Sequence, residues 1–432
     1  MDQSLIFDLA LIRKYDHAGP RYTSYPTAPQ FHDGFGEEGY RAAATRSNES
    51  GRPLSLYFHI PFCDTVCFYC ACNKIATKDR TLAVGYLERL HREIAMQGEL
   101  FDRSRRVDQL HWGGGTPTFI SHEQMRELMR VTAEHFSLAD DDSGEYSIEI
   151  DPREATAETI GMLRQIGFNR LSMGVQDLDP RVQQAVNRIQ SEAETLAVLE
   201  AARTNGFRSI SIDLIYGLPF QSAESFSRKL DRVIEVGPDR LSVFNYAHLP
   251  ERFKPQRRIN AEELPSASEK LEILDRTIER LTDAGYVYIG MDHFARPDDE
   301  LAQAQRDGTL YRNFQGYSTH ADCDLVAMGV TSISMVGPTY SQNMRGLEEY
   351  YQRLDAGRLP VFRGIELGRD DLIRRDVITR LICHFVLDFN SVETAWGIDF
   401  ADYFSDDLQR LTGMQADGLV EIDARGIRVL SR

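Results

Sequence analysis

The sequence predicts an α/β fold: a partial (β/α)6 barrel of the TIM type, with an N-terminal arm and a small, mainly helical C-terminal domain. Three observations support this prediction. Six strand-like segments alternate with helical patterns, helix-cap signals separate them, and the regular alternation stops near residue 290. Such alternation implies parallel strands joined by right-handed crossovers. We expect the arm at residues 1–50, the main domain at 51–368 with its core barrel at about 51–290, and the C-terminal domain at 369–432.

The strands are expected where apolar and β-branched residues cluster, at 54–60, 107–112, 145–150, 169–175, 208–215 and 239–246. Capping-box spacing, as in Ser121 with Gln124 and Ser191 with Glu194, marks the start of intervening helices, and Gly167 and Gly206 mark helix ends. A sixth helix fits 268–284. A further strand at 286–290 leaves an eight-unit barrel open as an alternative.

The terminal segments follow other patterns. Residues 1–50 have no strand period, and we interpret them as an irregular arm packed on the barrel. Near the C-terminus we expect helices at 371–385 and 400–412, then a hairpin of 419–422 with 427–430.

Composition and charge exclude several classes of protein. The 432 residues include 66 acidic and 49 basic ones, a net charge of −17, which argues against a broad electrostatic grip on nucleic acid or an anionic membrane. No apolar run approaches the roughly 18 residues of a membrane helix, and the first residues do not resemble a secretory signal. We therefore expect a cytoplasmic protein.

The strongest chemical signal is a cysteine group directly after the first strand. Cys63, Cys67 and Cys70 are spaced four and three residues apart, and Cys72 follows. Three thiolates can hold a 4Fe-4S cluster and leave its fourth iron without a protein ligand. The alternative is a structural zinc site closed by Cys72 or His59.

Several motifs together resemble one family. They are Arg21-Tyr-Thr-Ser-Tyr-Pro-Thr27, Tyr57-Phe-His-Ile-Pro-Phe-Cys63, Cys70-Ala-Cys72-Asn-Lys, His111-Trp-Gly-Gly-Gly-Thr-Pro-Thr118 and Gly290-Met-Asp-His-Phe-Ala295. The three-cysteine motif resembles the radical S-adenosylmethionine (SAM) superfamily, and the combination resembles its oxygen-independent coproporphyrinogen III oxidase family. The resemblance covers nearly the whole chain.

This resemblance implies an oxidoreductase of haem biosynthesis that uses one 4Fe-4S cluster and two SAM molecules. Reductive cleavage of SAM would give a 5′-deoxyadenosyl radical that removes hydrogen from propionate side chains of coproporphyrinogen III. Loss of carbon dioxide and of one further electron would then leave vinyl groups, twice per substrate, yielding protoporphyrinogen IX. The implied partners are this substrate, a low-potential electron donor and a terminal electron acceptor. We expect a monomer that binds no nucleic acid and no membrane.

The resemblance also implies roles for individual residues. Cys63, Cys67 and Cys70 would hold the cluster, and the catalytic candidates are Tyr57, Cys72 and Gln315. The residues expected to bind SAM are Tyr57, Tyr69, Gly114, Gly115, Thr116, Glu149, Gln176, Arg188, Asp213, Ala247 and Ile333.

Local cations are expected to bind the four carboxylates of the substrate, because the chain as a whole is acidic. The candidates are Arg21, Arg252, Lys254, Arg257 and Arg258, and a solvated charged loop is the alternative for the last four. Tyr69 stands where the family often has Phe, and His320 follows Ser-Thr where we would expect Gln.

Two other functions remain as alternatives at this stage. A haem-binding chaperone on the same scaffold is the nearer one, and Cys72 with the 21–27 segment argues against it. A winged-helix-like nucleic-acid binder built on the C-terminal helices and hairpin is the other, and the net acidity argues against that.

Overall fold

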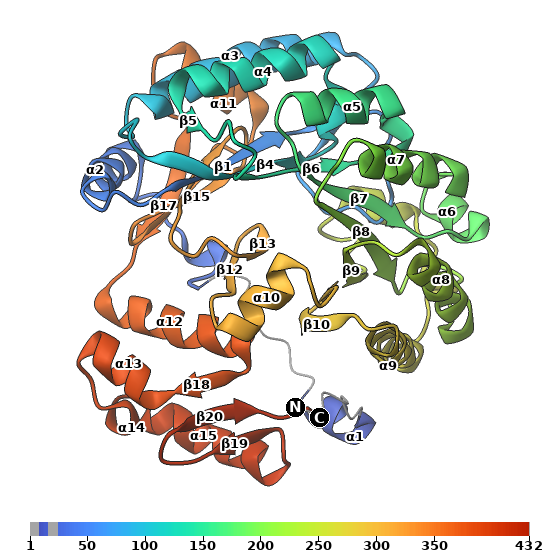
Figure 1. Cartoon of the computed structure of the whole chain (residues 1–432), viewed down its shortest axis with the longest axis vertical. Coiled ribbons are helices and arrows are strands. Elements are labelled where there is room, and N and C mark those ends of the chain that lie inside the picture. The colour runs from blue at the N-terminus through green and yellow to red at the C-terminus, as the bar shows by residue number, and fades with distance from the viewer. Residues whose placement is uncertain (1–7, 16–24, 432) are drawn as a thin grey trace.

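The fold is an open, strongly curved sheet with helices on its outer side, as the computed structural model in Figure 1 shows. The structure describes residues 8–15 and 25–431. Six parallel strands form the predicted partial barrel. They lie in the order β9-β8-β7-β6-β4-β1, with bounds β1 Leu54–Ile60, β4 Arg106–Gly114, β6 Glu145–Ile150, β7 Arg170–Gln176, β8 Ser209–Tyr216 and β9 Arg240–Asn245.

Helices cover the convex side of these strands because each crossover buries its apolar face against the sheet. In α3, for example, Ala83, Leu87, Leu90 and Ile94 are all buried. The capping boxes predicted at Ser121 and Ser191 both form. The crossover helices are α3 Thr81–Gly98, α4 His122–His135, α5 Ala157–Gln165, α6 Pro180–Ala185, α7 Glu192–Thr204, α8 Ala223–Val236 and α9 Ala267–Asp283.

The sheet continues at both edges rather than closing. Beyond β1 it gains β14 Asp324–Met328, parallel to β1, and then the antiparallel strands β15 Ile333–Val336, β16 Thr339–Asn343 and β17 Val361–Glu366. Beyond β9 it gains β11 His293–Ala295 and β10 Val287–Gly290. The strand predicted at 286–290 therefore exists, but the eight-unit barrel is wrong because the two sheet edges do not pair.

Two smaller elements lie below the concave side of the sheet in Figure 1. They are α10 Glu300–Asp307 and the hairpin of β12 Tyr311–Asn313 with β13 Gly316–Ser318. Directly after β1, the short strand β2 Phe62–Cys63 pairs in parallel with β3 Ile75–Ala76. No helix in the described part of the chain is long and apolar enough to cross a membrane.

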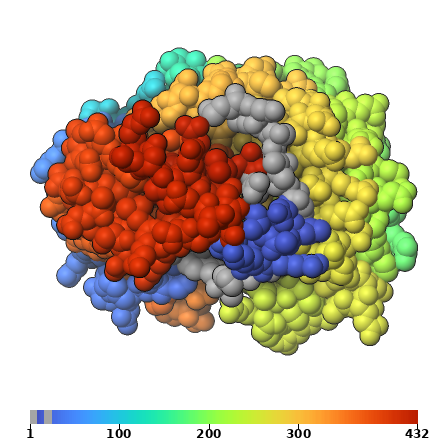
Figure 2. All heavy atoms as spheres, turned by 90° about the horizontal axis from the view of Figure 1, so that it is seen from below, coloured from blue at the N-terminus to red at the C-terminus, as the bar shows by residue number. Residues whose placement is uncertain are grey.

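The C-terminal domain has its own small core of nine buried side chains, among them Ile373, Leu387 and Phe400. The predicted helix at 371–385 is α12 Arg369–His384, whereas the helix expected at 400–412 is two, α14 Phe400–Tyr403 and α15 Ser405–Ala416. The predicted hairpin forms from β19 Val420–Ile422 and β20 Gly426–Val429, and β18 Val386–Asp388 adds a third strand. Helix α13 Phe389–Trp396 also belongs to this domain. Helix α11 Leu347–Asp355 precedes the domain and contacts α3. Figure 2 shows this domain (red) on one side of the lower face of the molecule.

The N-terminal region is more ordered than the predicted irregular arm. Helix α2, Glu37–Asn48, packs near β15–β17 with Tyr40, Ala43 and Ala44 buried, and His32 bridges to Gly364 of β17. Helix α1, Leu9–Tyr15, contacts the C-terminal domain instead, where Tyr15 donates a hydrogen bond to Asp417. Arg21 and the start of its motif lie outside the described residues.

Candidate active site

The three spaced cysteines line one cavity of about 340 Å³ at the carboxyl ends of the barrel strands. Cys63 ends β2, and pairing of β2 with β3 draws residues 64–74 into a closed loop that carries Cys67 and Cys70. The ammonium of Lys74 donates to the Cys70 carbonyl at 3.0 Å across this loop. The loop thereby arranges Cys63, Cys67 and Cys70 around one cavity.

The arrangement fits a cluster and does not fit a single zinc ion. Ligand atoms of a tetrahedral zinc site lie roughly 3.3–3.8 Å apart, given the usual zinc–ligand bond lengths. Within residues 8–15 and 25–431, the four neighbouring cysteines and His59 form no group whose ligand atoms all lie within 4.8 Å. A cubane, in contrast, spreads its protein ligands over separate irons. The donor set is therefore suited to a 4Fe-4S cluster held by Cys63, Cys67 and Cys70.

Positive charge lies directly beside Cys67. Arg188 Nη1 donates to the Cys67 Sγ at 3.5 Å, and Arg153 Nη2 lies 3.8 Å from the same atom. Asp151 holds both guanidinium groups, at 2.9 and 2.7 Å. Both guanidinium groups therefore lie within contact distance of a candidate cluster ligand. The structure thus places Arg188, predicted at the SAM site, at the boundary between that cavity and the cluster loop.

Thiol ionisation differs within the loop. Hydrogen bonding from Cys72 and the Lys74 charge lower the pKa of Cys70, whereas burial raises the pKa of Cys63 to about 11. Cys72 lines the same cavity and its pKa is raised by sharing its proton with Cys70. Cys72 therefore lies beside the cysteine triad and interacts with Cys70.

The glycine run after β4 presses its backbone against the strand that leads to the cysteines. Gly115 N donates to Ile60 O at 2.8 Å, and Thr116 N donates to Phe62 O at 2.8 Å. A Cβ on Gly115 would lie 2.6 Å from Phe62 O, and Gly114 has φ +115°, where L side chains are strained. All three residues line the cysteine cavity. Glycine is needed here for close approach, which fits a cradle for a ligand backbone.

Two carboxylates and an amide from β6, β8 and β7 line the same cavity. Although burial opposes it, hydrogen bonds from His111 and Gly114 N lower the pKa of Glu149, which is therefore ionised. Burial, reinforced by the Glu149 charge, raises the pKa of Asp213 to about 6. Gln176 has φ +67°, and its buried Oε1 has no hydrogen-bond partner in the described structure. A strained residue with an unpartnered acceptor beside a cavity indicates a ligand-binding role.

A second cavity of about 260 Å³ adjoins the first, and Glu149 lines both. Tyr57, Gln315 and Ile333 line this second cavity, so three predicted residues from β1, the β12–β13 turn and β15 come together. The Tyr57 ring stacks on His111 with centroids 5.8 Å apart, and its hydroxyl lies 3.1 Å from His59 Nδ1.

His111 was not predicted as a site residue, yet it lines this cavity, and its Nε2 lies 3.4 Å from Glu149 Oε1. A sequence signal for His111 existed. It lies two residues before Gly113 on β4, at the start of the glycine run, and alternate residues of a strand face the same side.

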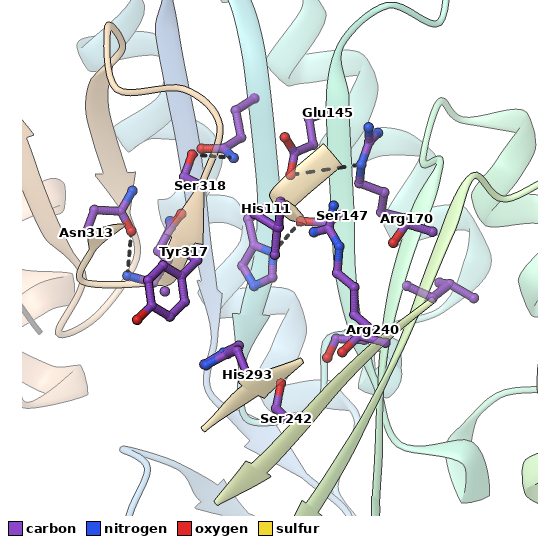
Figure 3. Close-up of a pocket in the computed structure, with 18 of the residues that line it drawn as sticks. His111, Glu145, Ser147, Arg170, Arg240, Ser242, His293, Asn313, Tyr317 and Ser318 are labelled. Atoms are coloured by element: carbon purple, nitrogen blue, oxygen red, sulfur yellow. Dashed lines mark hydrogen bonds and ion pairs between the residues drawn. The ribbon is translucent and has the colours of Figure 1, made fainter. Parts of the chain in front are cut away.

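The barrel interior at the amino ends of the strands, which we call its lower half, is polar, and Figure 3 shows Glu145, Arg170 and Arg240 among the residues that line it. Arg170 of β7 pairs with Glu300, and Arg240 of β9 pairs with Asp299 at 2.8 Å, so both strands are tied to the start of α10. His320, where we expected Gln, lies 3.4 Å from Glu145 of β6 in the same region. This unexpected residue therefore lies at the lower end of the barrel, away from the cysteines.

Of the other predicted residues in the described part of the chain, one lines a cavity and five do not. Tyr69 lines the cysteine cavity. Ala247 is exposed after β9 and is not among the residues that line either cavity. The four candidate substrate cations after β9, Arg252, Lys254, Arg257 and Arg258, are exposed and also line neither cavity.

Comparison with known proteins identifies the class that this fold and site define. Residues 57–233 match the family model of the radical SAM superfamily, and residues 367–432 match the HemN C-terminal domain. The chain is a radical SAM protein, so it holds a 4Fe-4S cluster and SAM. These matches do not support the nucleic-acid-binding alternative for the C-terminal region.

Full-length relatives narrow the class further. The chain is 58% identical over 431 residues to the oxygen-independent coproporphyrinogen III oxidase of Pseudomonas aeruginosa, covering 100% of this chain and 94% of the relative. It is 54% identical over 430 residues to that of Escherichia coli K12, covering 100% and 93%. The solved Escherichia coli coproporphyrinogen III oxidase (HemN), described as a radical SAM enzyme, superposes with a TM-score of 0.94 at 52% identity, covering 99% and 96%. The chain belongs to the oxygen-independent coproporphyrinogen III oxidase family, and it is an oxidoreductase of haem biosynthesis.

Proposed function

We propose that the chain decarboxylates two propionate side chains of coproporphyrinogen III to vinyl groups without oxygen, giving protoporphyrinogen IX. One observation carries the proposal: three cysteines surround a cavity that also presents a glycine cradle, ionisable carboxylates and an unpartnered amide. When bound, the cluster would supply the electron that cleaves SAM to methionine and a 5′-deoxyadenosyl radical.

The residues of this chain position the cofactor and exclude water. Gly114 and Gly115 let the methionine end of SAM approach the backbone, and the carboxylates of Glu149 and Asp213 accept hydrogen bonds from its hydroxyl or ammonium groups. The free Oε1 of Gln176 accepts one more. Arg188 and Arg153 offset negative charge at Cys67. Holding the reacting atoms in place in this way lowers the entropy cost of the radical step.

A second SAM molecule is part of the proposal. The adjoining cavity, lined by Tyr57, Gln315 and Ile333 and sharing Glu149 with the first, supports it. Tyr57 and Gln315 offer a hydroxyl and an amide there, and we propose that Tyr57 and Gln315 also contact the substrate. Cys72 is proposed to donate a proton or hydrogen bond beside the triad without acting as an iron ligand.

The remaining partners complete the proposed reaction. A low-potential donor supplies the electron for SAM cleavage, and an acceptor removes one electron per propionate. We also propose that the enzyme acts as a monomer in the cytoplasm, where thiols stay reduced.

Anaerobic product analysis by mass tests the function. After reconstitution with iron and sulfide, we expect a loss of two carbon dioxide molecules per coproporphyrinogen III, together with cleavage of SAM. Cleavage of SAM without decarboxylation would contradict the proposed substrate. Tight haem binding without turnover would favour the haem-chaperone alternative.

A further inference from the structure

A small apolar cluster joins the cysteine loop to the outer surface of the protein. It includes Val182 and Val186 of the α6 region and Ile259, and the side chains of Phe68 and Phe220 pack against it. Phe68 directly follows Cys67, and its backbone N donates to Val186 O at 2.9 Å. The surface of this apolar cluster therefore lies one residue from a proposed cluster ligand.

Cations gather on that surface. The Arg258 guanidinium lies 5.2 Å from the Phe68 ring centroid, and that of Arg181 lies 4.1 Å from the Phe220 ring centroid. Gln256, inside the segment that carries Arg257 and Arg258, donates to Tyr69 O at 3.0 Å and fastens the segment to the cysteine loop. We define the basic face as Arg181, Arg252, Lys254, Arg257 and Arg258.

The basic face lacks the acidic partners that most of the arginines in this protein have. All five cations are exposed, and none forms an ion pair with a residue in the described ranges 8–15 and 25–431. Residues 250–260 carry four cations against one carboxylate, Glu251, in a chain of net charge −17, and two more carboxylates, Glu262 and Glu263, follow at the end of the loop. Ile189, which is 69% exposed, directly follows Arg188, which contacts Cys67. Exposed cations without acidic partners that pack on aromatic rings, as Arg258 does on Phe68 and Arg181 on Phe220, are typical of a protein-binding surface.

We infer that the basic face docks the reduced electron donor, an acidic protein with a low-potential one-electron centre. The inference rests on the proposed function, which requires one electron for each SAM cleavage. The carrier is oxidised by one electron and the cluster is reduced by one, and no proton or atom crosses the interface. Because the net charge of −17 repels an acidic carrier elsewhere, a local positive surface steers it to the cysteine loop.

This role differs from the substrate-binding role that the sequence suggested for Arg252, Lys254, Arg257 and Arg258. Their side chains are exposed and are not among the residues that line the two cavities. The two roles predict different variants: a docking residue affects only reduction by a protein, whereas a substrate-binding residue affects turnover with any reductant.

The test compares the wild-type holoenzyme with the variant Arg257→Glu/Arg258→Glu. A bacterial flavodoxin, an acidic one-electron flavoprotein, serves as the probe, and dithionite serves as a small reductant that needs no docking surface. Arg425→Glu/Arg428→Glu is the matched control, because those two exposed cations lie on the C-terminal hairpin. Binding of oxidised flavodoxin is measured separately by titration, so docking is assessed independently of turnover.

We expect the Arg257/Arg258 variant to lower the rate constant for reduction by flavodoxin at least about tenfold at low salt, the lower end of electrostatic steering effects. Flavodoxin binding should weaken in parallel, and added salt should slow the wild type more than the variant. Iron content and dithionite-driven product formation should match the wild type. The control variant should behave as the wild type in every measurement.

Three results would overturn the inference. They are unchanged flavodoxin binding and reduction, an equal loss in the C-terminal control, and a raised KM for coproporphyrinogen III under dithionite, which would assign the cations to the substrate. Arg181→Glu, a single change on α6, gives a second variant with the same expected direction should the double variant lose iron. Failure of the wild type to decarboxylate under dithionite would refute the proposed function instead, and the binding titration would still decide the docking.

Discussion

Replacing Gly115 by alanine should displace the strand that carries Cys63. The added Cβ would lie 2.6 Å from Phe62 O and 2.8 Å from the Pro61 carbonyl carbon, both rigid backbone atoms. Ordinary contact begins at 3.4 Å, so the two chain segments must separate by about 0.8 Å, the difference between 3.4 and 2.6 Å.

Such a separation would stretch two hydrogen bonds, Gly115 N to Ile60 O and Thr116 N to Phe62 O, from 2.8 Å to beyond the usual bonding range. Two lost bonds cost about 2 kcal/mol, and overpacking adds about 1–3 kcal/mol, so the local cost is about 3–5 kcal/mol. If only 1.4 kcal/mol of this opposes the bound state, SAM affinity falls about tenfold.

The assay measures iron and sulfide per chain after anaerobic reconstitution, and then the Kd of SAM. Gly115→Ala should incorporate less iron and bind SAM at least about tenfold more weakly. The control is Gly85→Ala in α3, where the added Cβ meets only the flexible end of Arg89, at 3.5 Å. Alanine there should stabilise the helix by up to about 1 kcal/mol. A Gly115→Ala protein with a full iron complement and a SAM Kd within twofold of wild type would refute the reasoning.

Three further outcomes are expected. Because the Asp213 carboxyl has a pKa of about 6, SAM affinity measured by calorimetry should fall as the pH drops below 6, and Asp213→Asn should flatten that profile; an equal slope in the variant would contradict this. Burial raises the pKa of Glu93 to about 7, so the folded state holds its proton longer than the unfolded state. The free energy of unfolding should therefore decrease as the pH rises from about 4.5 to 7, by up to about 1.4 kcal/mol per pH unit relative to Glu93→Gln; parallel denaturation curves across that window would show that Glu93 does not titrate there. Cys72→Ser should keep its iron but lose product formation, and an unchanged rate would remove Cys72 from the site.

The six parallel strands could be predicted from the sequence because each is a short apolar run bounded by capping or glycine signals. The predicted bounds of β1 and β6 agree with the structure at both ends. The crossover helices were equally predictable, since buried positions such as Leu87 and Leu90 recur at helical spacing.

The antiparallel extension was not predictable, because its strands bury polar residues. Strand β16 reads Thr-Tyr-Ser-Gln-Asn, a turn-like composition, yet all five residues are buried. Asn343 at its end donates to buried Glu93 at 2.7 Å, and Glu93 lies about 250 residues earlier in the chain. Partners so distant in sequence leave no local pattern. Helix α2 was missed for a different reason: its N-cap, Gly36, offers no side-chain hydrogen bond to mark the start.

The candidate site was predictable to the extent that strand ends define it. The family resemblance implied that Glu149, Gln176 and Asp213 bind SAM, each lies on a barrel strand, and all three line the cysteine cavity. The surface position of the cations after β9 was not accessible in the same way. Their loop carries no period, and it is the Gln256 hydrogen bond to Tyr69 O and the contact of Arg258 with the Phe68 ring that place it against the cysteine loop.

The two ends of the barrel therefore have different electrostatic roles. At the lower end, buried Arg170 and Arg240 are neutralised by Glu300 and Asp299, and these pairs tie α10 across the polar interior. At the carboxyl ends of the strands, Glu149 accepts hydrogen bonds from His111 and Gly114 N, whereas the Gln176 Oε1 has no partner in the described structure, so its desolvation is compensated only when a ligand binds. The amino ends of the strands are thus held by ion pairs to α10, whereas the carboxyl ends combine the pairs of Asp151 with Arg188 and Arg153 with an unpartnered acceptor beside the cysteine cavity, and that open acceptor favours ligand binding at the cysteines.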